Sequence, residues 1–288
     1  MKDIFQINRE TCSRDGVCRE VCPVDVICLT DSGFPEPVIA AEDVCIRCGH
    51  CVAVCPTGSF HHRDMDPALC APVQETLQPS VAQIHHFLRS RRSVRAYKEK
   101  PVGRELLQKL IAAACAAPSA HNSQKVQWLV FGDRDKLNLL AAVTVDWMRW
   151  VIETMPERAS ELHLEGRVKR WESGVDGILR GAPVLIVAHG EKEIPALPPG
   201  SISELGNVTA PLDYAIALSY LELAAAGMGL GACWAGYVYK AANIFPPMHE
   251  ALCLPAGHQC FGAMMVGYPK YTYRRIPQRN APAITWRL

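Results

Sequence analysis

Four cysteines carry the clearest chemical signal in this sequence: Cys45, Cys48, Cys51 and Cys55 follow the spacing C-x2-C-x2-C-x3-C-P. Thiolates are the soft ligands that iron–sulfur chemistry requires. This spacing lets three thiolates converge on one cubane cluster, while the fourth binds the other cluster of a pair. Zinc sites also use C-x2-C pairs, but three cysteines within seven residues, followed by one before proline, favour an iron–sulfur cluster.

A second run, CSRDGVCREVCP, has the same spacing, except that Asp15 stands at the second ligand position. Under crossed pairing, one cluster takes Cys45, Cys48, Cys51 and Cys22, and the other takes Cys12, Cys18 and Cys55 with Asp15 facing the fourth iron. A carboxylate holds iron less softly than a thiolate, so the second cluster is expected to be a [4Fe-4S] cluster with a labile corner or a [3Fe-4S] cluster. Two alternatives stay open. Asp15 could merely start a turn, or Cys28 could replace it as the fourth ligand. The ordinary interpretation of Cys28 is a buried strand residue.

Over about 55 residues, the two runs resemble a bacterial two-cluster ferredoxin. Residues 1–62 contain few large apolar residues, so this segment is expected to fold around its metal. Nine of the 13 cysteines lie in the N-terminal quarter, which indicates two domains. The stretch 63–80 contains three prolines and reads as a linker to a second domain at 81–288.

The second domain mixes helical and strand patterns. Apolar residues recur at helical spacing at 84–88 and 106–111, and helical patterns cover roughly 143–180 and 212–226. Short strand-like runs occupy 126–131, 184–188 and 261–266. Helices outnumber strands, so the predicted fold class is α+β.

Several stretches of this domain have the residues to bind an anionic, flat cofactor. SRRSVRAYKEKPV (90–102) supplies arginines whose forks match phosphate oxygens in pairs, although a solvated basic face is the ordinary alternative. AAPSAHNSQKVQWLVF (116–131) offers small and amide-bearing residues that could approach a ring. GLGACWAGY (229–237) follows a helical pattern, and VGYPK and RRIPQR come near the C-terminus.

Together these stretches resemble the nitroreductase family of FMN-dependent oxidoreductases over about residues 84–280. The resemblance implies a central sheet flanked by helices and a homodimer with FMN at the subunit interface. It implies that the FMN phosphate and ribityl chain are held by Arg91, Arg92, Ser93, Arg95, Arg275 and, as a further contact, Arg274. It also implies that Pro118 and Ser119 line the flavin ring and that Ala235 and Gly236 supply backbone N–H groups near flavin N5. The resemblance further implies that His121 and Asn122 face the substrate, and that Asn122 also contacts the cofactor.

His121 is the one side chain singled out as a proton donor, because imidazole titrates near neutrality. The stretch GMGLGA (227–232) fits a dinucleotide-binding fingerprint, but a helical pattern precedes it where a strand is required, so no separate NAD(P) domain is expected. NAD(P)H can still stack on FMN directly in the family, so it stays open as the donor beside a ferredoxin.

The remaining notable residues have ordinary structural interpretations. The histidine pairs at 61–62 and 85–86 are expected at the surface, and Asp213 is expected to start a helix. Trp234 is expected either to shape the flavin pocket or to pack in the core. Packing roles are expected for Cys115, Cys233, Cys253 and Cys260.

The net charge of +1 over 288 residues favours neither nucleic acid nor a membrane surface as a partner. The uncharged run 223–239 is shorter than the roughly 20 residues that span a bilayer, and we expect a cytoplasmic protein. The predicted function is transfer of electrons between a donor, the clusters and FMN to reduce a small electrophile of the nitroaromatic, quinone or enone type. The alternatives are an electron-transfer module between proteins and a cluster-based redox sensor.

Overall fold

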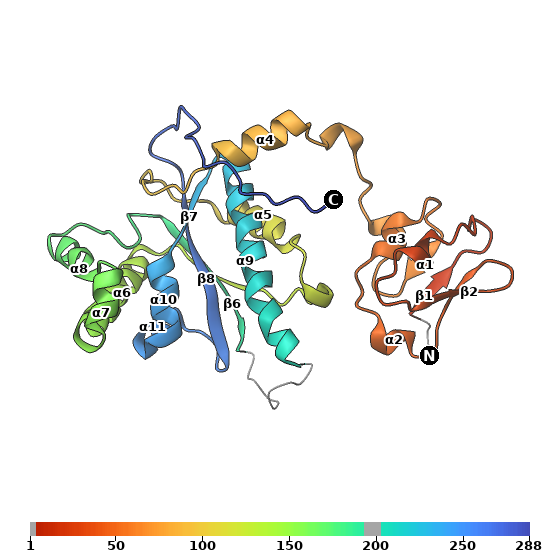
Figure 1. Cartoon of the computed structure of the whole chain (residues 1–288), viewed down its shortest axis with the longest axis horizontal. Helices are drawn as coiled ribbons and strands as arrows, with labels where there is room; N and C mark the ends of the chain where they lie inside the picture. The colour runs from red at the N-terminus through yellow and green to blue at the C-terminus, as the bar shows by residue number, and fades with distance from the viewer. Residues whose placement is uncertain (1–3, 193–202) are drawn as a thin grey trace. The chain divides into compact units, whose positions relative to one another are not determined.

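The computed structural model describes residues 4–192 and 203–288 and divides the chain into two compact units (Figure 1). The first unit comprises the residues up to Pro79 together with Ser119–Ser123, and the second comprises Ser80–Pro118 and Gln124–Leu288. The stretch expected as a linker is therefore grouped with the first unit up to Pro79. Its first residues continue the backbone pairing of that unit, because the Arg63 N–H donates to the Ile4 carbonyl at 2.8 Å.

Two small antiparallel sheets and three short helices build the first unit. Strand β1 (Phe5–Ile7) pairs with β4 (Phe60–His62), and β2 (Ile27–Leu29) pairs with β3 (Pro35–Pro37). In the described residues of this unit, the three α-helices are α1 (Val17–Glu20), α2 (Ala41–Val44) and α3 (His50–Val54). Single turns of 3₁₀ helix form η1 (Pro67–Leu69), η2 (Glu75–Leu77) and η3 (Ala120–Asn122). The ring centroids of Phe5 and Phe60 lie 4.5 Å apart in its core, with the ring planes tilted by 34°. Strands of three residues are too short to leave a periodic pattern in the sequence.

The two cysteine runs fold alike in one detail. Gly16 and Gly49 each follow the second ligand position and start α1 and α3 with φ angles of 75° and 76°. Only glycine adopts this left-handed conformation without strain. Each glycine thus turns the chain so that the third ligand position of its run, Cys18 or Cys51, lies in the following helix.

The second unit contains one antiparallel sheet with the strand order β5-β6-β8-β7. Its strands are β5 (Gln127–Phe131), β6 (Val184–Glu191), β7 (Gly231–Trp234) and β8 (His258–Gly267). The α+β prediction is confirmed, and three of the four strands lie where the sequence predicts them. Strand β7 was not predicted, because its four residues contain a glycine and little alternation.

Helices cover both faces of this sheet (Figure 1). One face carries α5 (Arg104–Cys115) and α9 (Ser203–Gly227), and the other carries α6 (Arg134–Thr154), α7 (Pro156–Glu161), α8 (Leu164–Glu172), α10 (Gly236–Ile244) and α11 (Pro246–Leu252). Strand β6 is buried on both sides: Leu185 and Val187 enter one core, and Ile186 and Ala188 enter the other. Helix α4 (Val81–Ser90) has no buried residue.

Two helical predictions need correction. The pattern at 143–180 starts earlier, at Arg134, and is broken at Pro156, because proline cannot continue the hydrogen-bond ladder of α6 but can begin α7. Asp213 lies inside α9 rather than at its start, because that helix already begins at Ser203. Among the residues 4–192 and 203–288, no helix is long and apolar enough to cross a bilayer.

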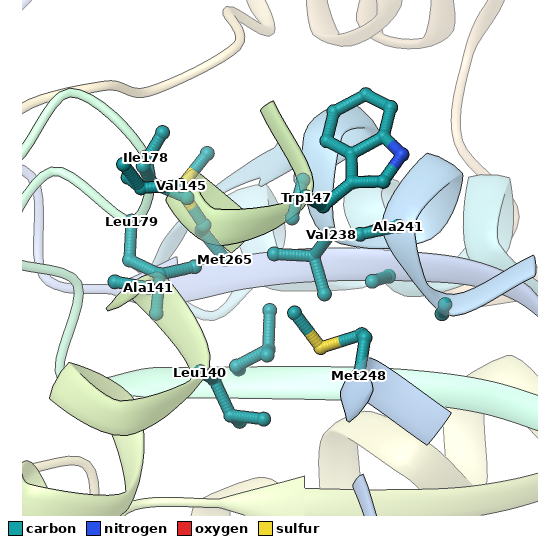
Figure 2. Packing of buried hydrophobic residues seen from close by; sticks show 14 of the residues in the cluster. Leu140, Ala141, Val145, Trp147, Ile178, Leu179, Val238, Ala241, Met248 and Met265 are labelled. Carbon is teal, nitrogen blue, oxygen red and sulfur yellow. The ribbon is translucent and has the colours of Figure 1, made fainter. Parts of the chain in front are cut away.

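The hydrophobic core on the α6 side of the sheet holds the first turn of α10 in place. Figure 2 shows Trp147 and Leu140 of α6 in the same cluster as Val238 of α10 and Met248 of α11. Trp147 is only 1% exposed, and the other three side chains are fully buried. Helix α10 is therefore held against α6 and the sheet, and this packing positions Gly236 at its first turn.

The cysteines of the second unit divide into two groups. Cys233 and Cys260 are buried, as expected for packing residues, whereas Cys115 and Cys253 are exposed. The expectation was wrong for the latter two because each ends a helix: Cys115 is the last residue of α5, and Cys253 follows α11.

Candidate functional site

One cavity of the first unit is lined by all four residues predicted for the second cluster. Its walls include Cys12, Asp15, Cys18 and Cys55, together with backbone and apolar side chains such as Phe60. Three thiols and one carboxyl group around one cavity fit an iron–sulfur cluster with three thiolate ligands and one weaker corner. Chain-distant residues meet here, because Cys55 comes from the other cysteine run.

Asp15 also has a local structural role. Its Oδ1 accepts a hydrogen bond from the Val17 N–H at 3.2 Å, and its Oδ2 accepts one from the Ser13 hydroxyl at 2.8 Å. The turn interpretation is therefore correct, but a carboxylate has further lone pairs and can accept more than these two bonds. Cys28 is in a strand, as predicted, but it is exposed rather than buried and does not line the cavity. Its thiol faces outward and donates to the Glu36 carbonyl at 3.3 Å.

The residues predicted for the first cluster are all partly buried: Cys22, Cys45, Cys48 and Cys51. Of these, Cys22, Cys45 and Cys51 pack against the hydrophobic core of the first unit. Burial, with a smaller contribution from the neighbouring Cys48 and Cys45, raises the pKa of Cys51 to about 12. Such a thiol loses its proton to a bound metal rather than to water. Within the described residues, no three His, Cys, Asp or Glu side chains are gathered to hold a single metal ion.

Hydrogen bonds prepare Cys55 for a negative charge. Burial alone would raise its pKa, but the Thr57 hydroxyl and the backbone N–H groups of Thr57, Phe60 and Ser59 together lower the pKa below its ordinary value. Donors that point at a sulfur favour its thiolate form. Cys18, in contrast, has a pKa raised by burial.

The two histidines of β4 differ in environment. His61 is exposed as expected, but His62 is only 5% exposed, so the prediction of a surface pair is wrong for it. Alternate residues of a strand face opposite sides, and His62 faces the core. Burial lowers its pKa despite the opposing effect of Asp64. His85 and His86 are both exposed on α4.

In the second unit, the arginine-rich loop after α4 runs along the edge strand β7. The Val94 N–H donates to the Ala232 carbonyl at 3.0 Å. This approach requires glycine at 231, since a Cβ there would lie 2.4 Å from the Val94 side chain. Arg91 is anchored separately, because its Nη1 lies 2.7 Å from Oε1 of Glu222 on α9. Burial raises the pKa of Glu222, and Arg91 opposes that rise.

A cavity of about 280 Å³ opens where this loop meets the start of α10. Its polar lining is cationic, with Arg95, Arg180 and Lys240, and no Asp or Glu of the described chain lines it. Trp234, Ala235 and Gly236 form another wall. The volume is near the lower end of the range for cofactor sites, roughly 300–1,000 Å³. The arrangement can hold a flat molecule with negative charge.

One of the two predicted backbone donors is unavailable. The Ala235 N–H already donates to the Ala263 carbonyl at 2.8 Å, because the pairing of β7 with β8 continues one residue past Trp234. Gly236 is the first residue of α10, where no intrahelical carbonyl can reach the N–H group. Gly236 therefore remains the candidate donor, and Ala235 contributes a wall only.

Sequence reasoning missed Arg180. The Asp176 carboxylate accepts bonds from the N–H groups of Ile178, Leu179 and Gly181, each at 2.9 Å. These bonds close a tight loop, in which Arg180 has a φ angle of 57° and lines the cavity. The available signal was the sequence DGILRGAP directly before an apolar strand, since Asp and Gly favour turns. Lys240, one helical turn after Gly236, was also missed.

Other predicted residues do not line this cavity: Arg91, Arg92, Ser93, Pro118, Ser119, His121, Asn122, Arg274 and Arg275. Arg274 and Arg275 are exposed in an irregular segment after β8. Ser119, His121 and Asn122 belong to the segment grouped with the first unit. There the Asn122 side-chain amide donates to the carbonyls of Ile46 and Arg47 at 3.3 and 2.9 Å. The GMGLGA stretch runs from the end of α9 into β7, which is the reverse of a dinucleotide-binding turn.

Comparisons with protein families give two matches. A model described as the nitroreductase family matches residues 88–268, and a model described as a 4Fe-4S binding domain matches residues 39–61. The second match includes Cys45, Cys48, Cys51 and Cys55. It favours the iron–sulfur interpretation over zinc.

Individual relatives match either the nitroreductase part or the iron–sulfur part of the chain. A protein of Methanothermobacter thermautotrophicus, named for NADH dehydrogenase/NAD(P)H nitroreductase, is 25% identical over 182 residues, which are 63% of this chain and 75% of the relative. A ferredoxin of Hydrogenibacillus schlegelii, named Ferredoxin 7Fe, is 45% identical over 56 residues, which are 19% of this chain and 65% of that ferredoxin.

Solved structures agree on the fold of the second unit. A nitroreductase with bound FMN from Bacteroides fragilis superimposes with a TM-score of 0.55 and 22% identity, covering 70% of this chain and 97% of that one. A BluB-like flavoprotein from Clostridium difficile gives a TM-score of 0.53 and 21% identity, covering 69% and 94%. At these identities the likeness is one of fold.

Proposed function

The chain belongs to the nitroreductase family and carries a 4Fe-4S binding segment, and from this premise we propose that it is an iron–sulfur flavoprotein oxidoreductase. Electrons pass between an external donor, two clusters and FMN, and they reduce a small electrophile of the nitroaromatic, quinone or enone type. The observation that carries this proposal is the combination, in one chain, of a thiol-lined cavity with a cationic cavity beside Gly236.

FMN, when bound, supplies one- and two-electron chemistry. The positive charges of Arg95, Arg180 and Lys240 favour a cofactor with negative charge. The Gly236 N–H would be the backbone donor to the ring edge of bound FMN, and Trp234 and Ala235 would shield that edge from water. By family resemblance, the remaining cofactor contacts are Arg91, Arg92, Ser93, Pro118, Ser119, Asn122, Arg274 and Arg275, and His121 is the candidate proton donor to the substrate.

The two clusters have different ligand sets. One is a [4Fe-4S] cluster held by Cys22, Cys45, Cys48 and Cys51. The other is held by Cys12, Cys18 and Cys55, with Asp15 at the open corner, and is a [4Fe-4S] cluster with a labile corner or a [3Fe-4S] cluster. The similar ferredoxin is named for seven irons, which is the sum of one four-iron and one three-iron cluster, and this supports the three-iron form.

The assembled protein is proposed to be a cytoplasmic homodimer. Large apolar side chains are exposed on α4, on α9 and in the C-terminal segment, including Leu88, Tyr220 and Trp286. Exposed apolar surface of this extent is typical of an interface. The electron donor is NAD(P)H or a ferredoxin; the name of the Methanothermobacter relative supports the former.

The proposal is tested on anaerobically purified full-length protein. Iron and FMN per chain are measured first, and EPR spectra are recorded before and after stepwise reduction. The reduced flavin is then mixed with a nitroaromatic, a quinone, an enone or air. We expect at least one small acceptor to reoxidise the flavin faster than air does. Rapid cluster–flavin exchange without turnover of any small acceptor would instead favour an electron-transfer module.

A further inference from the structure

His62 lies against one of the predicted cluster ligands. Its Nε2 is 3.7 Å from the Sγ atom of Cys45, within hydrogen-bonding distance for a sulfur acceptor. The imidazole is 5% exposed, so water does not compete for this contact. A buried polar side chain beside a sulfur needs a partner there, and Cys45 is the partner.

The proton of the His62 ring is on the nitrogen that faces the sulfur. The Asp64 backbone N–H donates to Nδ1 at 3.1 Å, so Nδ1 is an acceptor and carries no proton. In neutral imidazole the other nitrogen then carries the proton. The Asp64 carboxylate is engaged by Arg47, with a distance of 3.3 Å between Nε and Oδ2. The geometry therefore gives an Nε2–H group directed at Cys45.

Cys45 receives a second donor from the backbone. The Arg47 N–H donates to the same sulfur at 3.4 Å. Hydrogen bonds to the ligating sulfurs are one of the levers by which a protein sets the potential of a cluster, because they stabilise the more negative, reduced form. The backbone donor is independent of residue type, whereas the imidazole donor depends on the residue at position 62.

The internal repeat of the first unit provides a comparison within the chain. His62 stands seven residues after Cys55 of the second Cys-Pro pair, and Leu29 stands seven residues after Cys22 of the first. Leucine has no donor. At this position of the repeat, the second half therefore has a side-chain hydrogen-bond donor that could tune a cluster, and the first half has none.

We propose that His62 is a positioning residue for the cluster held by Cys45: its Nε2–H bond to the sulfur raises the reduction potential of that cluster above the value it would otherwise have. The inference rests on the proposed function, because it requires a cluster on Cys45. No proton moves in the step. The cluster gains one electron from its reductant, and the Nε2–H group stays on the imidazole.

The test is a redox titration of the anaerobic full-length protein with dithionite and mediator dyes, followed by EPR. In His62→Leu, which installs the residue of the other half, we expect one of the two cluster couples to move to a more negative potential. The reduced-to-oxidised ratio at a fixed potential should fall about tenfold, equivalent to ~59 mV for a one-electron couple. The second couple and the iron content should not change.

Two variants serve as controls. His61→Leu alters the exposed neighbour on the same strand and should leave both potentials unchanged. His62→Gln retains an N–H donor and should restore much of the lost potential. An unchanged pair of potentials in His62→Leu with full iron content would overturn the inference.

A second measurement covers the case in which His62→Leu loses iron. Wild-type protein with ¹⁵N-labelled histidine should show an imidazole nitrogen coupled to the reduced cluster in pulsed EPR, and the coupling should persist in His61→Leu and vanish in His62→Gln. Absence of this coupling in wild type also overturns the inference. Failure of the wild type to bind iron would instead reject the proposed function, and the iron assay reveals it separately.

Discussion

Arg91 and Glu222 form an ion pair across 131 residues of sequence, with Nη1 of the arginine 2.7 Å from Oε1 of the glutamate. The two side chains are only 20% and 14% exposed. A pair this sheltered orients the guanidinium more firmly than a surface pair does. The guanidinium of Arg91 has further N–H groups that can donate to a phosphate. Glu222 thus fixes the orientation of Arg91, which the proposed function makes a contact of the FMN phosphate.

Replacement of Arg91 by Gln should weaken FMN binding by about tenfold or more, since a hydrogen bond between charged groups contributes roughly 1.5–3 kcal/mol. Glu222→Gln should weaken it by less, because the arginine remains but loses its anchor. Fluorescence titration of the flavin-free protein with FMN measures both. Arg89→Gln, on the exposed part of α4, is the matched control. Unchanged flavin affinity in Arg91→Gln would remove Arg91 from the cofactor site.

The Asp176 loop gives a second prediction. Asp176→Ala leaves three backbone N–H groups without their acceptor, and we expect the free energy of unfolding to fall by roughly 1–3 kcal/mol. FMN affinity should fall as well, because Arg180 is no longer held at the cavity. Urea denaturation followed by tryptophan fluorescence measures stability, and all six tryptophans lie in the second unit.

Asp146→Ala provides the comparison for this loop. Asp146 makes an exposed ion pair with Arg149, and its loss should change stability by less than about 1 kcal/mol. Equal effects of the two substitutions would show that the Asp176 loop has no special role in the second unit.

A third prediction concerns pH. Burial lowers the pKa of His189, and the neighbouring His258, whose Nδ1 lies 3.1 Å from that of His189, lowers it further. Below the usual histidine pKa of about 6.5, the unfolded chain therefore binds a proton more readily than the folded chain. The free energy of unfolding should be highest above this pH and fall as the pH drops below it.

Tryptophan-monitored urea denaturation between pH 7.5 and pH 5.5 tests this dependence in the second unit. His189→Asn should flatten the decline, whereas substitution of the exposed His86 should leave it intact. A decline that is as steep in His189→Asn as in wild type would assign the effect to other groups.

The fourth prediction addresses the open corner. Asp15→Cys completes a four-thiolate set around the cavity, so the cluster there should be a stable four-iron cluster. Any three-iron EPR signal of the oxidised wild type should disappear, and iron per chain should rise. Asp15→Asn, which adds no thiolate, should show neither change. If iron content and spectra are the same in Asp15→Cys and wild type, position 15 lies outside the ligand shell.

The features that could be predicted from the sequence are those that depend on the spacing of residues close together in the chain. The cysteine runs, the glycines that follow their second positions and the apolar strands at 184–188 and 261–266 depend on residues a few positions apart, so their patterns are visible in the chain itself. The same holds for the α+β class. Short strands such as β1 and β7 escaped prediction because three or four residues carry too little periodicity.

By itself, the sequence determined the cluster motifs, the order of the two parts of the chain and the family of the larger one, because each depends on residue types at fixed local spacing. The tertiary structure alone decided that Arg91 meets Glu222, that Arg180 reaches the cationic cavity and that the Ala235 N–H is taken by Ala263. It also decided that His62 rather than His61 faces Cys45, a predicted cluster ligand. These contacts join residues far apart in sequence or select one side of a strand, and only the packed core brings such groups within hydrogen-bonding distance.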